Sequence, residues 1–216
     1  MQTKHFLLAL GAGALLATGA SAAVVGATIE AASSFDGPDR SPDHTIDGTG
    51  LDTSDPNPLN WTHDTGFPAG GGSGFFWHDA VGSVPDDASI TFNLGSIVDL
   101  NAVLIWNFNA TFSGGPETDR GFNQYDMFVS SDNVTYTQIV TDGTLAQASG
   151  TTSETAQVVN VAGLANGIQY VRLEADTNHG SASHTGLSEV RFDVVPEPGS
   201  LALLGLGGLA LLRRRR

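Results

Sequence analysis

Length, composition and charge exclude several functions. The chain has 216 residues, no cysteine, and a formal net charge of −14 from nine basic and 23 acidic residues. The lack of cysteine excludes disulfides, thiol catalysis and cysteine-ligated zinc. An acidic surface repels phosphate backbones, so nucleic acid is excluded as a partner, and it attracts hard cations such as calcium.

The first 22 residues have the layout of a secretory signal peptide. Lys4 gives a short basic start, an apolar stretch follows, and Ala20-Ser21-Ala22 supplies small residues before Ala23. We expect cleavage after Ala22 and export of the chain. The alternative is a short N-terminal membrane anchor, which the small-residue cleavage pattern disfavours.

The region from Ala23 to Val194 is long enough for one domain that buries about 70% of its unfolded surface. Its apolar residues follow strand periodicity, and residues 125–140 contain a turn at Ser131-Asp132-Asn133, residue types that tolerate left-handed backbone. The segments predicted to form strands are residues 89–95, 102–109, 125–140, 168–175 and 187–195.

This region has no apolar stripe of helical period, and its glycine-rich segments 68–74 and 112–121 are typical of long surface loops. Several short strands joined by such loops predict an all-β sandwich.

The last 22 residues, 195–216, form a distinct segment. Val195-Pro196-Glu197-Pro198 precedes an apolar run, Leu201 to Leu212, and four arginines end the chain. Twelve helical residues span about 18 Å, less than the roughly 30 Å of a bilayer core, so a lasting transmembrane helix is not expected. The alternative is an apolar tail without function.

This tail resembles the PEP-CTERM sorting signal of Gram-negative bacteria, with Pro196, Glu197 and Pro198 as its motif. The resemblance implies that an exosortase, a membrane-embedded cysteine protease, cuts near the motif. Until then the apolar run would hold the precursor transiently in the inner membrane. The processed protein would then reach the cell surface or the extracellular matrix.

The segments between the two ends also occur in a familiar order. They are SSFDGPDRSPDHTIDG, ITFNLG, RGFNQYDMFVSSD, YVRLEA and LSEVRFDV. In this order they resemble a discoidin-type domain, the coagulation-factor C-type or galactose-binding-like fold that many carbohydrate-binding modules share. The resemblance covers residues 27–194 and implies a discoidin-like jelly-roll β-sandwich.

The same resemblance implies one structural Ca²⁺ where an early loop meets the last strand. Asp47 and Glu189 match the usual carboxylate ligands, and Thr49 is a further oxygen candidate. Calcium takes six to eight oxygens at about 2.3–2.6 Å, which loop and strand oxygens can supply together. The alternative is that Asp47 caps a turn and Glu189 is a solvated strand residue.

Sugar-binding relatives stack a pyranose on an exposed aromatic ring and bind its hydroxyls with polar side chains. The candidates here are Trp61 with His63, Trp77 with His78, and Arg120. Trp61 falls where the family usually has a core-side tryptophan, and for Trp77 a core position and a ligand contact remain equally open.

No catalytic constellation stands out in the sequence. The histidines lack a zinc-protease or triad spacing, and His179 and His184 fit a polar loop better than a metal pair. Carboxylates are too numerous for a glycosidase pair to be singled out. We therefore expect a non-enzymatic, exported protein that binds carbohydrate, such as its producer's exopolysaccharide. The alternatives are a structural surface protein without a specific ligand and, less favoured, a glycoside hydrolase.

Overall fold

The computed structural model describes residues 23–65, 74–80, 88–112 and 114–196. The predicted signal peptide, most of the glycine-rich segment 68–74 and the sorting segment from Glu197 onward lie outside these residues. Within the described residues, no helix is long and apolar enough to cross a membrane.

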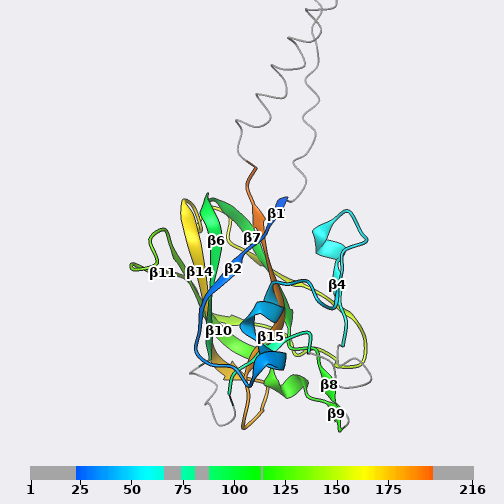
Figure 1. Ribbon diagram of the computed structural model, residues 1–216. Helices are drawn as coiled ribbons and strands as arrows, with labels where there is room; N and C mark the ends of the chain where they lie inside the picture. Colours follow the sequence, from blue (N-terminus) through cyan, green and yellow to red (C-terminus); the bar gives the residue numbers. More distant parts are fainter. Residues whose placement is uncertain (1–22, 66–73, 81–87, 113, 197–216) are drawn as a thin grey trace, which may run out of the picture.

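The described chain is built mainly of antiparallel strands (Figure 1). Those of the two main sheets are β1 (Ala23–Val25), β2 (Thr28–Ala32), β5 (Trp77–His78), β6 (Ser89–Val98), β7 (Leu100–Asn107), β10 (Phe122–Ser130), β11 (Thr137–Thr144), β13 (Gln157–Asn160), β14 (Ile168–Asn178) and β15 (Gly186–Val194). Those of two smaller sheets are β3 (Leu51–Asp52), β4 (Thr62–His63), β8 (Thr111–Phe112), β9 (Gly115–Pro116) and β12 (Glu154–Thr155).

One main sheet has the order β1-β15-β7-β13, with β5 also paired to β15, and the other has the order β11-β10-β14-β6-β2. The two sheets pack face to face. Phe92 of β6 and Phe192 of β15 meet edge-on between them at a ring distance of 5.3 Å. This arrangement confirms the predicted all-β sandwich.

The core follows from the strand patterns in the sequence. Apolar residues of β6, including Ile90 and Phe92, are buried, and β7 is almost wholly buried because it lies between β15 and β13. The predicted turn after β10 is also present. Asn133 has a φ of 60°, and Asp132 Oδ1 accepts hydrogen bonds from two backbone N–H groups beyond it.

The helices of the described residues are short 3₁₀ turns: Pro38–Arg40, Pro42–Thr45, Pro58–Asn60 and Thr118–Arg120. The last of these, together with the β8–β9 hairpin, lies in the segment 112–121 that the sequence predicts to be an irregular loop. Two-residue strands carry no periodic signature, so the sequence pattern misses them.

β1 and the end of β15 lie at one end of the sandwich, and β8 and β9 lie at the other (Figure 1). Ala23 pairs with Val194, and the Val195 N–H donates to the Asp99 carbonyl at 2.8 Å. The sandwich therefore starts at the predicted signal-peptide cleavage point and ends next to the predicted sorting motif, with both junctions at the same end.

Candidate functional site

The candidate site lies where β5 meets the start of β15, about 26 Å of strand from the end that carries the chain termini. Asp79, directly after β5, forms two hydrogen bonds with Thr185. The Asp79 N–H donates to the Thr185 carbonyl at 3.0 Å, and the Thr185 N–H donates to Asp79 Oδ1 at 2.7 Å. Position 186 requires glycine, because a Cβ there would lie 2.0 Å from the Trp77 carbonyl oxygen. These contacts fix the two histidines that flank them.

The two histidines are His78 on β5 and His184 just before β15. They are 1% and 7% exposed, and their ring centroids lie 4.3 Å apart. The Nδ1 atoms of both rings lie within hydrogen-bond distance of one acceptor, the Asp79 carbonyl oxygen, at 2.9 and 3.2 Å. Because a carbonyl only accepts, each Nδ1 carries the hydrogen and each Nε2 keeps a lone pair.

Both imidazoles are neutral at pH 7. Burial is the largest cause that lowers the pKa of His78 to about 4, and the charges of Arg120 and Arg40 lower it further, against a hydrogen bond from His78 to the Asp79 carbonyl. Burial also lowers the pKa of His184. Each neutral imidazole can therefore accept a hydrogen bond or bind a metal ion through Nε2.

Arg120 brings a guanidinium to His78. Its Nη1 lies 3.4 Å from His78 Nε2, and its other end forms an ion pair with Glu117 three residues earlier. Phe108 and Phe112 lie beneath this guanidinium, at 6.0 and 5.1 Å from ring centroid to Cζ. The arginine is thus held by a carboxylate and two rings while part of it faces the histidines.

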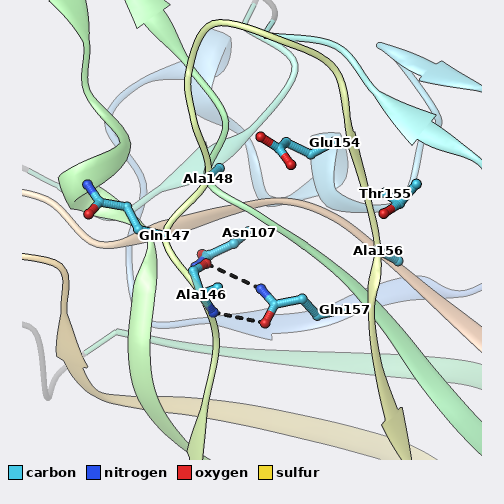
Figure 2. Close-up of a pocket in the computed structure, with 8 residues that line it drawn as sticks. All are labelled: Asn107, Ala146, Gln147, Ala148, Glu154, Thr155, Ala156 and Gln157. Carbon is cyan, nitrogen blue, oxygen red and sulfur yellow. Dashed lines mark hydrogen bonds between the residues drawn. The ribbon is translucent and has the colours of Figure 1, made fainter.

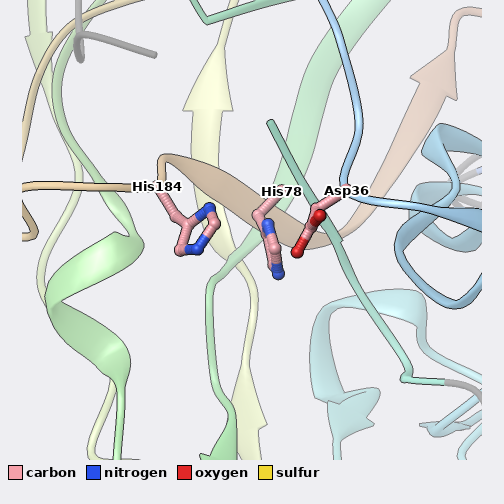
Figure 3. Close-up of side chains that lie close together, drawn as sticks. All are labelled: Asp36, His78 and His184. Carbon is pink, nitrogen blue, oxygen red and sulfur yellow. The ribbon is translucent and has the colours of Figure 1, made fainter. Parts of the chain in front are cut away.

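Asp36, on the loop after β2, completes the group that we call the histidine pocket: Asp36, His78, Arg120 and His184. The Asp36 N–H donates to the His78 carbonyl at 3.3 Å, and its exposed carboxylate lies beside the His78 ring (Figure 3). One ligand atom from each of Asp36, His78 and His184 lies within 4.8 Å of the others.

The structure brings two of the predicted ligand residues together, His78 and Arg120. It places Trp77 in the core, at 0% exposure, with its indole N–H bonded to the Ser34 carbonyl at 2.9 Å and its ring against Phe122. A fully buried ring has no face for a sugar, which resolves the open question about Trp77 in favour of the core.

Trp61 and His63 lie elsewhere, on the small sheet β12-β4-β3 and the turn before it. The Trp61 indole N–H donates to the Asp55 carbonyl at 2.8 Å, and the Trp61 carbonyl accepts from the indole of Trp106. His63 is fully buried and its Nδ1 is 2.9 Å from the Asp64 carbonyl. Both residues therefore hold local structure together in this conformation and are not part of the histidine pocket.

Sequence reasoning missed Asp36 and Arg40, and it assigned His184 to a polar loop with His179. Arg40 lies over the rings of Phe76 and Phe112, at 5.1 and 5.4 Å. The sequence signal for Arg40 is composition, since it is one of just four arginines between residues 23 and 194, which contain no lysine. Asp36, His78 and His184 are far apart in the chain and meet only after β5 has paired with β15.

A second charged cluster, which we call the glutamate corner, contains Asp47, Glu189 and Arg191. Glu189 is fully buried on β15, contrary to the alternative of a solvated strand residue. Arg191 Nη2 lies 2.6 Å from Glu189 Oε1, and Arg191 Nη1 donates to the Ile46 carbonyl at 2.6 Å. The arginine thus ties β15 to the turn that carries Asp47.

Arg191 links the segments of the two predicted carboxylate ligands, because it pairs with Glu189 and donates to the carbonyl of Ile46, next to Asp47. Burial raises the pKa of Glu189 to about 8; Arg191 opposes this rise, whereas the charge of Asp47 adds to it. Burial also acts to raise the pKa of Asp47, but hydrogen bonds from Thr49 and His44 bring it below its usual value. Asp47 Oδ1 accepts the Thr49 N–H at 2.7 Å, so Asp47 does cap its turn.

A polar hollow of about 200 Å³ lies between β7 and the segment 146–157 (Figure 2). Its polar groups are already bonded to one another. The Asn107 amide donates to the Ala146 carbonyl at 2.9 Å, and the Ala146 N–H donates to Gln157 Oε1 at 2.8 Å.

Comparison with known proteins gives two results. A model of the PEP-CTERM protein-sorting motif matches residues 194–216. No curated protein matches the chain in sequence.

Among solved structures, a family 32 carbohydrate-binding module from a family 31 glycoside hydrolase of Clostridium perfringens is 17% identical, with a TM-score of 0.50. The match covers 78% of this chain and 91% of that one. An F5/8 type C domain from Bacteroides fragilis is 11% identical, with a TM-score of 0.48 over 80% and 95% of the two chains. The chain therefore combines a discoidin-like β-sandwich with a C-terminal PEP-CTERM sorting motif.

Proposed function

We propose that this is an exported, non-catalytic protein that binds carbohydrate in the histidine pocket. The observation that carries the proposal is the approach of His78 Nε2 and Arg120 Nη1, 3.4 Å apart, beside two further polar side chains and above aromatic rings. The similarity in fold to a carbohydrate-binding module supports it. The ligand class that we favour is polysaccharide, including the producer's own exopolysaccharide.

The pocket offers the groups that a sugar needs. Hydroxyls both donate and accept, and the pocket supplies acceptors in the Nε2 lone pairs and the Asp36 carboxylate, together with donors in the Arg120 guanidinium. The apolar face of a pyranose needs an exposed ring. Phe35, the neighbour of Asp36 in the chain, is 50% exposed and can provide one.

A glycan array and calorimetry on the purified, processed protein test this proposal. We expect Arg120→Ala to abolish binding while the melting temperature stays within about 2 °C. Arg172→Ala, which removes an arginine paired with Glu174 on the other sheet, is the matched control and should bind normally. If the wild-type protein ignores every glycan, including native exopolysaccharide, a structural surface role replaces the binding function.

We also propose that an exosortase processes the chain near Pro196, Glu197 and Pro198, after transient retention in the inner membrane of a Gram-negative bacterium. The motif match supports this proposal, and so does the end of β15 at Val194, because a cut beyond Pro196 leaves intact every strand among the described residues. The intact mass of the exported protein locates both cuts. A mass that retains the four terminal arginines contradicts processing.

Calcium at the glutamate corner is a third proposal. The oxygens of Asp47 and Glu189, with Thr49 and the Ile46 carbonyl, fit its preference, and neither Glu189 oxygen receives a hydrogen bond of standard geometry from the described residues. The guanidinium of Arg191 competes for the same oxygens. We expect the melting temperature to fall on chelation and to recover with calcium. An unchanged melting temperature would mean that Arg191, and not calcium, is the cation that pairs with the carboxylates of the corner.

A further inference from the structure

We propose that Asp36, His78 and His184 bind a divalent transition-metal ion of the zinc class. The ligand atoms are one carboxylate oxygen and one ring nitrogen from each histidine, all within 4.8 Å of one another. This site goes beyond sugar binding and does not depend on it.

The two imidazoles are oriented as metal ligands usually are. A metal-bound histidine typically donates its other N–H to a carbonyl or carboxylate, which fixes the ring and its tautomer. Here both Nδ1 atoms are held by the single Asp79 carbonyl, so that both Nε2 lone pairs are left for an ion. Two imidazoles and a carboxylate favour zinc, cobalt or nickel over calcium or magnesium.

The three segments that carry the ligands are already joined by backbone hydrogen bonds. Asp36 is bonded to the His78 carbonyl, and Asp79 is bonded to Thr185 in both directions. A tetrahedral ion with bonds of about 2.1 Å needs ligand atoms about 3.4 Å apart. Asp36 is exposed and its carboxylate lies beside the His78 ring, so its side chain can rotate toward an ion (Figure 3).

The local charge also admits a cation. Arg40 is coupled electrostatically to Arg120 and to three carboxylates, those of Asp36, Asp39 and Glu117. With both imidazoles neutral, these five groups sum to a negative charge. The competing Arg120 contact to His78 Nε2, at 3.4 Å, is long for a hydrogen bond, and Arg120 keeps its ion pair with Glu117 when an ion takes the nitrogen.

Three protein ligands leave at least one coordination position open. Water fills this position in the absence of a ligand, and a sugar hydroxyl can replace it. The simpler alternative is that the histidines and Asp36 only form hydrogen bonds to sugar hydroxyls, and the experiment separates the two.

The test is titration of the metal-stripped, processed protein with Zn²⁺ by calorimetry and with Co²⁺ by visible absorption. We expect one equivalent to bind and the melting temperature to rise with Zn²⁺. His184→Gln and Asp36→Asn should each weaken binding at least about 10-fold. His179→Ala is the matched control, because His179 bonds to the Leu145 carbonyl outside the cluster, and it should bind the ion as wild type does.

Absence of saturable binding by the wild-type protein overturns the proposal, and so does equal affinity in His184→Gln. The thermal shift of the wild-type protein needs no variant, so a variant that misfolds does not weaken the test. Sugar binding is measured separately in chelator, with Arg120→Ala. That variant should lose sugar but keep the metal, so that failure of one function is distinguished from failure of the other.

Discussion

The glutamate corner joins an early loop to β15, and the histidine pocket joins another early loop to the residues just before β15. The two sites differ in whether their buried groups carry charge. In the corner, a fully buried carboxylate lies 2.6 Å from a guanidinium two residues along the same strand. In the pocket, buried imidazoles stay neutral and direct their lone pairs away from the carbonyl that orients them. The corner therefore pairs a buried carboxyl with an arginine of the same strand, whereas the pocket keeps neutral nitrogen acceptors, one of which faces Arg120.

Removing the cation of the corner should have the largest effect. At pH 9, above the Glu189 pKa of about 8, Arg191→Met leaves a buried carboxylate without its partner, and we expect the free energy of unfolding to fall by about 3 kcal/mol. The control, Arg172→Met, breaks an exposed pair with Glu174 and should cost less than about 1 kcal/mol. Urea denaturation measures both. Equal losses would show that the corner is not an internally neutralised site.

Lowering the pH should reduce the folding stability through His78 of the histidine pocket. The folded-state pKa of His78 is about 4, below the unfolded value of about 6.5, so the unfolded chain binds the extra proton. Stability is then fully present above about pH 6.5 and is lost as the pH falls toward 4. Between pH 7 and pH 5 the loss from His78 is about 2 kcal/mol.

Denaturation in chelator across this pH range, for wild type and His78→Gln, isolates that contribution. His63, whose pKa burial also lowers, lies outside the pocket and cancels in the difference, whereas the difference includes the coupling of His78 to His184, because their rings lie 4.3 Å apart. Parallel pH profiles would contradict a neutral, buried His78.

A smaller loss of stability is expected when Gly48, which lies next to Arg191 of the glutamate corner, is replaced by alanine. Gly48 has a φ of 76°, and a Cβ there would lie 3.0 Å from Arg191 Nη2. Gly37 has a nearly equal φ of 78° with open space around it. Gly37→Ala should cost about 1 kcal/mol from backbone strain alone, and Gly48→Ala about 2 kcal/mol because Arg191 must also move. Thermal melts of the two variants compare them directly. Equal losses of stability in the two variants would mean that Arg191 moves away from a Cβ at position 48 at no cost in free energy.

The two sites also differ in how much of them can be predicted from sequence. The strands follow from apolar periodicity, and the turn at Asn133 follows from residue types that accept a positive φ. Asp47 and Glu189 were paired through a family resemblance, and the structure does place them at one corner. Arg191 was not anticipated, because a strand pattern does not show which neighbour a buried carboxylate takes.

The histidine pocket was only half predicted. His78 was a candidate because it follows Trp77, and Arg120 because it ends a glycine-rich segment. His184 and Asp36 join them only through the two-residue strand β5. So short a strand has no period to read, and its partner on β15 lies more than a hundred residues away. The burial of Trp77 has the same cause, since its flanking aromatic residues are equally compatible with a core and with a binding surface.

The edge of the sandwich offers a weaker, partly buried version of the glutamate corner. The Ala23 backbone nitrogen lies 3.1 Å from Asp193 Oδ1. The predicted cleavage after Ala22 would turn this nitrogen into an ammonium group and so create an ion pair at the junction of β1 and β15. A chain that begins at Ala23 should be about 0.5 kcal/mol more stable than one that retains Ser21-Ala22, and Asp193→Asn should remove that difference. Chemical denaturation of the four proteins forms a double-mutant cycle, in which a coupling energy of zero would show that the new terminus makes no pair.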